Sequence, residues 1–183
     1  LSTGQANAGQ LSEALAELAS HEVTLPETAI VTALQKYAVD ELISPQDWTC
    51  RNFGRVLREI DAGTALREAF VPMLGEEEAE SQAIACSVFA SGADAWPTGI
   101  EPVADRLRTR VRADNDQVST PALSALVTVG REFPAVLHPI AGWLTSRRDS
   151  PDGLTLRRRR YEAIWLLAAD GADFTDDVYR ALR

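Results

Sequence analysis

Residues 100–107 read IEPVADRL, and residues 137–144 read LHPIAGWL. Both stretches contain an apolar residue, any residue, proline, a β-branched residue, alanine, two free positions and leucine, and they lie 37 positions apart. A polar loop and a second apolar segment follow each one, at residues 125–129 and 163–167. A unit of this length that contains two helices is typical of helical repeat proteins. The two stretches therefore predict helix pairs in a repeated arrangement.

Apolar residues recur at i, i+3, i+4 and i+7 along most of the chain, which places them on one face of a helix. No segment of similar length alternates with period two, so no strand is expected. The clearest apolar stripes are Leu11, Ala14, Leu15 and Leu18; Phe53, Val56, Leu57 and Ile60; Leu66, Ala69, Phe70 and Met73; Val103, Leu107 and Val111; Leu137, Ile140, Ala141 and Leu144; and Tyr161, Ile164, Trp165 and Ala168. We expect an all-α fold of antiparallel helix pairs stacked as a short α-solenoid, with an irregular helical bundle as the alternative.

Residues 97–170 resemble the HEAT-like helical repeats, in which a proline-marked first helix, a polar turn with an acidic residue and a second helix that opens with a basic residue recur. The first unit departs from this pattern, because Ser119 and Thr120 stand where the basic residue is expected. Residues 70–73, FVPM, are a candidate third copy, although the next helix follows them at a much shorter distance. The matching residues are Pro102 and Pro139 in the first helices, Asp116 and Asp152 in the turns, and Arg159 or Arg160 in the second helix.

The composition is that of a folded domain. Of the 183 residues 45% are hydrophobic and 25% are charged, far from the composition of disordered chains. We expect one helical domain over residues 1–183, excised or processed from a longer chain because it begins with Leu1. No apolar run is long enough to span a membrane and the start lacks a signal-peptide layout, so we expect a cytoplasmic protein with no membrane contact.

Charge is distributed unevenly along the chain. Residues 1–100 contain 5 basic and 15 acidic side chains, whereas residues 101–183 contain 13 basic and 12 acidic ones, for a net charge of -9 overall. All 13 basic residues of the second half are arginines, and ten of them fall in two clusters, at positions 106–112 and 147–160. Arginine clusters suit phosphates or acidic partners, although most charge runs are solvated surface.

Helical geometry divides the first arginine cluster. With Leu107 and Val111 facing inward, residues 106 and 110 fall on one flank of the helix and residues 108 and 112 on the other. In the second cluster, positions 157 and 158 fall near the buried side if the last helix already includes them. The candidate residues for binding an anion or an acidic partner are Arg147, Arg148, Arg157, Arg158, Arg159 and Arg160.

The sequence has no recognisable reactive constellation. His21 and His138, the only histidines, are distant in sequence from Cys50 and Cys86. Nucleophile elbows, zinc-ligand spacings and glycine-rich phosphate loops are missing from the sequence. We therefore expect no catalytic residue, no metal and no cofactor.

The sequence favours a non-catalytic helical-repeat scaffold that binds a protein partner. The alternative is a protein that binds nucleic acid or acts on it as an enzyme, as do the alkylpurine DNA glycosylases that share the HEAT-like architecture. In that case the arginines would bind the phosphate backbone, Trp143 would contact a base and an aspartate would be the catalytic residue. The acidity of the first half weakens attraction to a polyanion, so this alternative is not favoured. Otherwise, we expect Trp143 and Trp165 to pack in the core.

Overall fold

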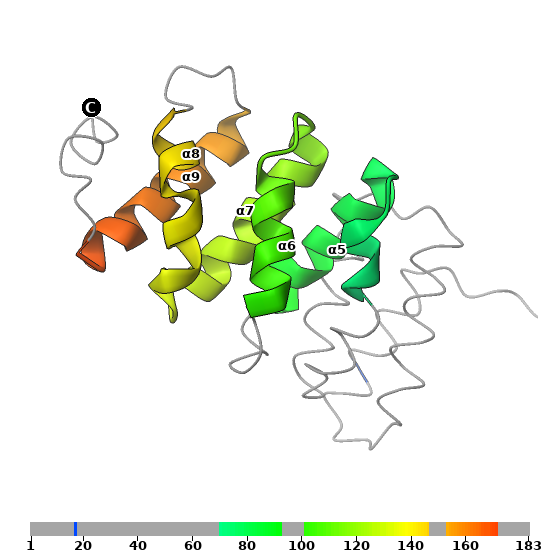
Figure 1. The fold of residues 1–183 in the computed structure, drawn as a ribbon, viewed down its shortest axis with the longest axis horizontal. Helices are drawn as coiled ribbons and strands as arrows, with labels where there is room; N and C mark the ends of the chain where they lie inside the picture. Colours follow the sequence, from blue (N-terminus) through cyan, green and yellow to red (C-terminus); the bar gives the residue numbers. More distant parts are fainter. Residues whose placement is uncertain (1–16, 18–69, 93–100, 147–152, 172–183) are drawn as a thin grey trace, which may run out of the picture.

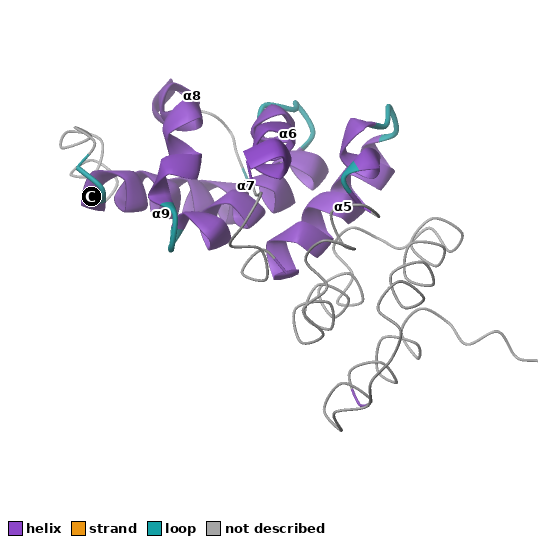
Figure 2. Ribbon diagram, turned by 60° about the horizontal axis from the view of Figure 1, so that its bottom comes forward, coloured by secondary structure: helices purple, strands orange, loops and turns teal. Residues whose placement is uncertain are grey.

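The computed structural model describes Glu17 and residues 70–92, 101–146 and 153–171 (Figure 1). Within these ranges the chain is helical and contains no strand (Figure 2), so the predicted all-α class is confirmed for this part. The apolar stripes at 11–18 and 53–60 lie outside the described residues. None of the described helices has both the length and the hydropathy needed to cross a membrane.

The helices form two layers (Figures 1 and 2). The first layer contains η1, α6, and η3 with α8, and the second layer contains α5, α7 and α9. In chain order the described elements are the 3-10 helix η1 (Pro72–Gly75), α5 (Ala79–Gly92), α6 (Glu101–Val111), α7 (Asp116–Gly130), the 3-10 helix η3 (Pro134–Ile140), α8 (Ala141–Ser146) and α9 (Leu154–Ala169). Each first-layer element thus precedes a second-layer helix in the chain.

The second-layer helices run side by side in the same direction. Near the ends of α7 and α5, the Thr128 hydroxyl lies 3.5 Å from the main-chain oxygen of Ala90. At the starts of α7 and α9, a side chain added at Gly153 would touch the carboxylate of Asp116. Equivalent ends of α5, α7 and α9 therefore lie together, and the three helices lie side by side in the second layer (Figure 2).

Helix α7 is the centre of the packing. It contacts α5, α6, α9 and η3, and nine of its residues are buried. The two sequence copies bury matching residues, because Ala125, Leu126 and Val129 of α7 and Ala163, Ile164 and Leu167 of α9 are all in the core. The first-layer stripe Val103, Leu107 and Val111 is buried as well, as predicted. Burial of this kind is the main stabilising contribution to such a fold.

The stretch at 137–144 is less regular than its sequence copy. Helical conformation begins earlier, at Pro134, and continues as a 3-10 helix to Ile140 before α8 starts. Two prolines within seven residues remove main-chain donors, which favours the short 3-10 form over a regular α-helix. The end of α7 approaches this segment closely at Gly130, where an added Cβ would lie 2.7 Å from the Leu137 side chain.

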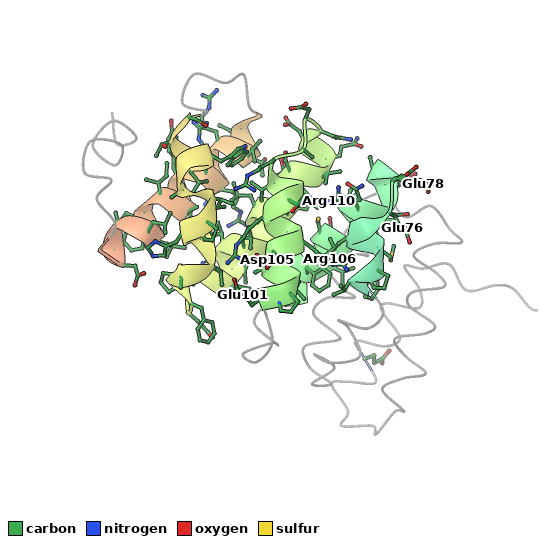
Figure 3. The ribbon with its side chains drawn as sticks, in the orientation of Figure 1. Glu76, Glu78, Glu101, Asp105, Arg106 and Arg110 are labelled. Atoms are coloured by element: carbon green, nitrogen blue, oxygen red, sulfur yellow. The ribbon has the colours of Figure 1, made fainter. Side chains whose placement is uncertain are left out.

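Four arginines connect the first layer, three of them in α6 and Arg112 directly after its last residue. As predicted, they divide between two flanks: Arg106 and Arg110 extend toward η1 (Figure 3), and the other two toward η3. The bonds of this arginine ladder (residues 106, 108, 110 and 112) are Arg106 Nη1 to Val71 O at 3.0 Å, Arg110 Nε to Leu74 O at 2.7 Å, Arg108 Nε to Val136 O at 2.9 Å and Arg112 Nη2 to Pro139 O at 3.1 Å. These arginines therefore join helices and do not form a surface patch.

The Val136 carbonyl lies where the 3-10 helix η3 lacks a main-chain donor, whereas the Val71 carbonyl already accepts the N–H of Leu74 at 3.2 Å. The last carbonyls of any helix have no partner within it, and Pro139 has no N–H to offer the carbonyl of Val136. Arg108 supplies that donor although its own side chain is buried. Its Nη1 lies 2.6 Å from a carboxylate oxygen of Glu101 and 2.6 Å from one of Asp105, which compensate its charge. Arg108 is thus the most fully satisfied member of the ladder.

We predict that Arg108→Met lowers the free energy of unfolding by about 2–3 kcal/mol, because it leaves the buried Val136 carbonyl without this donor. Arg112→Met is the matched control, since Arg112 is exposed and donates one bond to Pro139, and it should cost less than about 1 kcal/mol. Urea denaturation followed by circular dichroism measures both values. Equal losses in the two variants would contradict a special role for Arg108.

Candidate binding groove

A groove of about 550 Å³ lies across the second layer, between α5, α7 and α9. Most of the side chains that line it are small, and many carry a hydroxyl group. Its lining includes Ser87, Ala90 and Ser91 of α5; Asp116, Gln117, Thr120, Pro121, Ser124 and Thr128 of α7; and Thr155, Leu156 and Arg159 of α9, with Gly153 before it. All three second-layer helices therefore contribute to one concave surface.

The floor of the groove is one face of α7. Residues Gln117, Thr120, Ser124 and Thr128 follow each other at three- or four-residue spacing, so they form a polar stripe opposite the buried face. At 1.5 Å of rise per residue, the stripe is about 16 Å long. This length is sufficient for a short segment of a partner and too large for a single ion.

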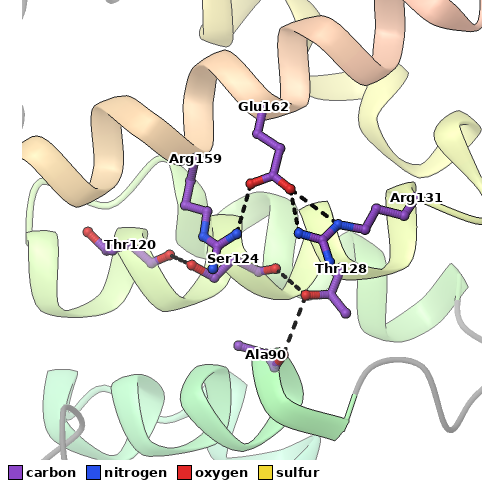
Figure 4. Close-up of polar contacts among 7 residues, drawn as sticks. All are labelled: Ala90, Thr120, Ser124, Thr128, Arg131, Arg159 and Glu162. Atoms are coloured by element: carbon purple, nitrogen blue, oxygen red, sulfur yellow. Dashed lines mark hydrogen bonds and ion pairs between the residues drawn. The ribbon is translucent and has the colours of Figure 1, made fainter.

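The floor hydroxyls donate their protons to main-chain carbonyls one turn earlier (Figure 4). Ser124 Oγ donates to Thr120 O at 2.9 Å, and Thr128 Oγ1 donates to Ser124 O at 3.0 Å. Across the groove, Ser91 Oγ donates to Ser87 O at 3.2 Å. A hydroxyl has one proton and two lone pairs, so these oxygens remain available as hydrogen-bond acceptors.

A cluster of three charged residues, Arg131, Glu162 and Arg159, joins α9 to the end of α7 (Figure 4). Arg131 Nη2 lies 2.5 Å from Glu162 Oε1, and Arg159 Nη1 lies 2.8 Å from Glu162 Oε2. Burial acts to raise the pKa of Glu162, but the hydrogen bonds and charges of the two arginines outweigh it and hold the pKa below its ordinary value. The Glu162 cluster therefore carries one net positive charge.

The opposite charge lies where α7 and α9 begin. Asp116 is in the first turn of α7, and it lies beside Gly153, the residue before α9. Gly153 has no side chain to cap the start of α9, and a nearby carboxylate is favourable at a helix N-terminus. Asp116 thus makes this end of the groove negative, while Arg159 makes the α9 wall positive further along.

The structure separates the arginines proposed from the sequence. Arg147 and Arg148 lie outside the described residues, and positions 157 and 158 are exposed, so the expectation that they lie near the buried side was wrong. Only Arg159 lines the groove. The described members of the predicted set therefore do not form one surface.

The environments of Arg160 and Trp165 are the reverse of those predicted from the sequence, which placed Arg160 at a binding surface and Trp165 in the core. Arg160 is 1% exposed, with its guanidinium carbon 5.5 Å from the centre of the Tyr161 ring, whereas Trp165 is 60% exposed. The buried stripe of α9 starts at Leu156 and passes through Arg160, so the helix is rotated relative to the stripe read from its aromatic residues. Arg160 is therefore not available to a partner at the surface. Trp143 is half-buried and packs against the core, as expected.

The floor of the groove was missed by sequence reasoning, although part of its signal was present. Thr120, Ser124 and Thr128 recur every four residues in an otherwise apolar helix, which marks one polar face. The Glu162 cluster left no such signal, because Arg131 and Glu162 are 31 residues apart.

The described residues offer a binding surface more readily than a reactive one. Burial raises the pKa of the Cys86 thiol from its ordinary 9.0 to about 12, although the charge of Arg110 and a backbone hydrogen bond act in the opposite direction. No three His, Cys, Asp or Glu side chains gather closely enough to hold a metal ion in the part of the chain that is described. Comparison of the chain with protein-family models, curated proteins and solved structures gives no match.

We predict that Cys86 is inert toward thiol reagents in the folded protein. A thiolate is the reacting species, and a raised pKa with complete burial suppresses it. In a Cys50→Ser background, Ellman's reagent at about pH 8 should label Cys86 at least about a hundredfold more slowly in buffer than in denaturing urea. Rapid labelling of the native protein would show that the thiol is accessible and ionised.

We predict that Glu162→Gln lowers the free energy of unfolding by about 1 kcal/mol at neutral pH, because two partly exposed ion pairs are lost. Since the folded pKa of Glu162 is below the ordinary 4.5, its contribution is present above that pH and is lost as pH falls through the folded value. The difference between wild type and variant should therefore shrink in acid. Glu132→Gln, at an exposed position, is the control, and a difference that is constant with pH would contradict the assignment.

Proposed function

We propose that this chain is a non-catalytic, HEAT-like helical-repeat scaffold that binds a partner protein in the groove across α5, α7 and α9. The observation that carries the proposal is the groove itself, because three successive second-layer helices line it. Stacked helix pairs characteristically provide extended concave surfaces of this kind for protein partners. A partner seated here would contact more than one repeat unit.

The repeat interpretation has support from the order and contacts of the described elements. They alternate between the layers as η1 and α5, α6 and α7, then η3 with α8 and α9. The arginine ladder makes equivalent contacts on both sides of α6. At η1 and at η3, two arginines donate to main-chain carbonyls that are three residues apart. Pro72 and Met73, the second half of the candidate third copy at 70–73, begin η1, and η1 occupies the corresponding place beside α6.

Nucleic-acid binding has less support from the same contacts. A protein that grips phosphates needs exposed basic side chains on one surface. The α6 arginines donate to main-chain carbonyls instead, and Arg160 is buried. Among the residues that line the groove Arg159 is the one basic side chain, and Asp116 opposes it, so the groove offers little positive charge to a phosphate backbone. We therefore place the protein partner first.

The test compares two threonine-to-tryptophan variants of the full chain. Thr128 lies on the groove floor, and Thr109 lies on the exposed face of α6; each donates its hydroxyl proton to a carbonyl four residues earlier. We expect Thr128→Trp to fill the groove and weaken partner binding by at least about tenfold. Thr109→Trp should bind like wild type. The measurement is quantitative pull-down from a lysate of the source organism, followed by titration of the purified partner.

Three results would overturn the proposal. Equal binding by both variants would place the interface elsewhere, and measurable turnover of a substrate with no partner captured would favour an enzyme. Tight binding of duplex DNA that weakens steeply with salt would favour the nucleic-acid alternative. Circular dichroism and melting curves establish that both variants are folded.

A further inference from the structure

We infer that the occupant of the groove is an extended polypeptide segment held through its main chain, with an acidic side chain that meets Arg159. This inference rests on the proposed function, and it names the chemistry of the partner. It follows from three properties of the groove: the hydrogen-bonding character of its floor, its dimensions, and the arrangement of its charges.

The floor offers both acceptors and donors to its occupant. The hydroxyls of Ser124 and Thr128 donate to carbonyls of α7 and can still accept, whereas the side-chain amide of Gln117 can also donate. An extended peptide presents unpaired N–H and C=O groups along its length, whereas a helix has already used most of its main-chain groups internally. Nucleic-acid phosphates supply acceptors only, so they cannot donate to the oxygens of Ser124 and Thr128. The extended peptide is the occupant whose groups complement these oxygens.

The dimensions agree with a main chain lying on the floor. A stripe of about 16 Å accommodates roughly five residues of extended chain at 3.3 Å per residue. The side chains at Ala90, Ser124 and Thr128 are small, so a backbone can approach within hydrogen-bonding distance of the hydroxyls. Pro121 of α7 and the exposed Leu154 at the start of α9 provide apolar surface for the side chains of the segment.

The charges set the identity of two positions in the segment. One Nη of Arg159 is bound to Glu162, but a guanidinium has five N–H donors, and the Glu162 cluster retains one positive charge. A carboxylate of the segment would be attracted to this wall. Asp116 lies beside Gly153, six residues before Arg159, or about 9 Å along α9. A basic side chain would therefore be favoured roughly three residues away from the acidic one.

The experiment selects peptides from a random linear library displayed on phage, with the full-length chain immobilised. Enriched sequences are synthesised, and fluorescence polarisation gives their dissociation constants. We expect peptides that bind wild type and Thr109→Trp but bind Thr128→Trp at least about tenfold more weakly. N-methylation of central amides, which removes N–H donors and keeps the side chains, should weaken binding by a similar factor.

A double-mutant cycle tests the contact with Arg159. Replacing the acidic residue of the peptide by its amide should weaken binding to wild type about tenfold but should have little effect on Arg159→Gln. Arg157→Gln is the matched control, because Arg157 is an exposed arginine of α9 that does not line the groove. The amide peptide should bind Arg157→Gln about tenfold more weakly than the acidic peptide does, as it does with wild type.

The outcomes separate this inference from the proposed function. Groove-dependent peptides that tolerate N-methylation, or that bind as helices, overturn the extended main-chain mode but leave the scaffold proposal standing. A selection without any peptide sensitive to Thr128→Trp also overturns the inference, and the pull-down then decides the proposed function by itself. If replacing the acidic residue by its amide weakens binding to wild type and to Arg159→Gln by the same factor, the acidic side chain does not contact Arg159.

Discussion

The bonds between α6 arginines and main-chain oxygens are the constraint on which the described architecture depends. In η3, Pro139 has no N–H to offer the carbonyl of Val136, and a buried unpaired carbonyl is costly. Arg108 supplies that donor and its three companions bond to other carbonyls of the flanking segments, so η1 and η3 are fixed on either side of α6. Helix α7 packs beneath this layer, and its opposite face forms the groove floor.

The parts of the fold that could be predicted are those controlled by local periodicity. The stripe through Val103, Leu107 and Val111 and the matching segments of α7 and α9 are buried, because apolar residues at helical spacing have one favourable orientation. In α9 the prediction failed at Trp165, which is exposed, whereas Ile164 of the same predicted stripe is buried. Large aromatic residues indicated a face through Trp165, but Leu156 and Ala163 define the buried face and bring Arg160 inside. The aliphatic stem of Arg160 allows this burial, although the charge of its guanidinium disfavours it.

The candidate site was less predictable for a different reason. Its floor is local, and the four-residue spacing of Thr120, Ser124 and Thr128 is visible in the sequence. Its walls come from helices that meet only in the folded chain, so the pairing of Arg131 with Glu162 could not be read from positions 31 residues apart. The arginine ladder could not be predicted from the sequence either. Its acceptors are main-chain carbonyls such as that of Val136, and every residue type has one.

This choice of acceptor has an evolutionary consequence. Every residue has a main-chain oxygen, so the amino acids at positions 71, 74 and 136 can change while the bonds from α6 persist. The buried Arg108 does not have this freedom, because no other side chain offers the same forked donors at the same reach. Selection on its contact is therefore one-sided: the donor should stay fixed while the opposing position drifts, and correlated substitutions will not reveal the contact.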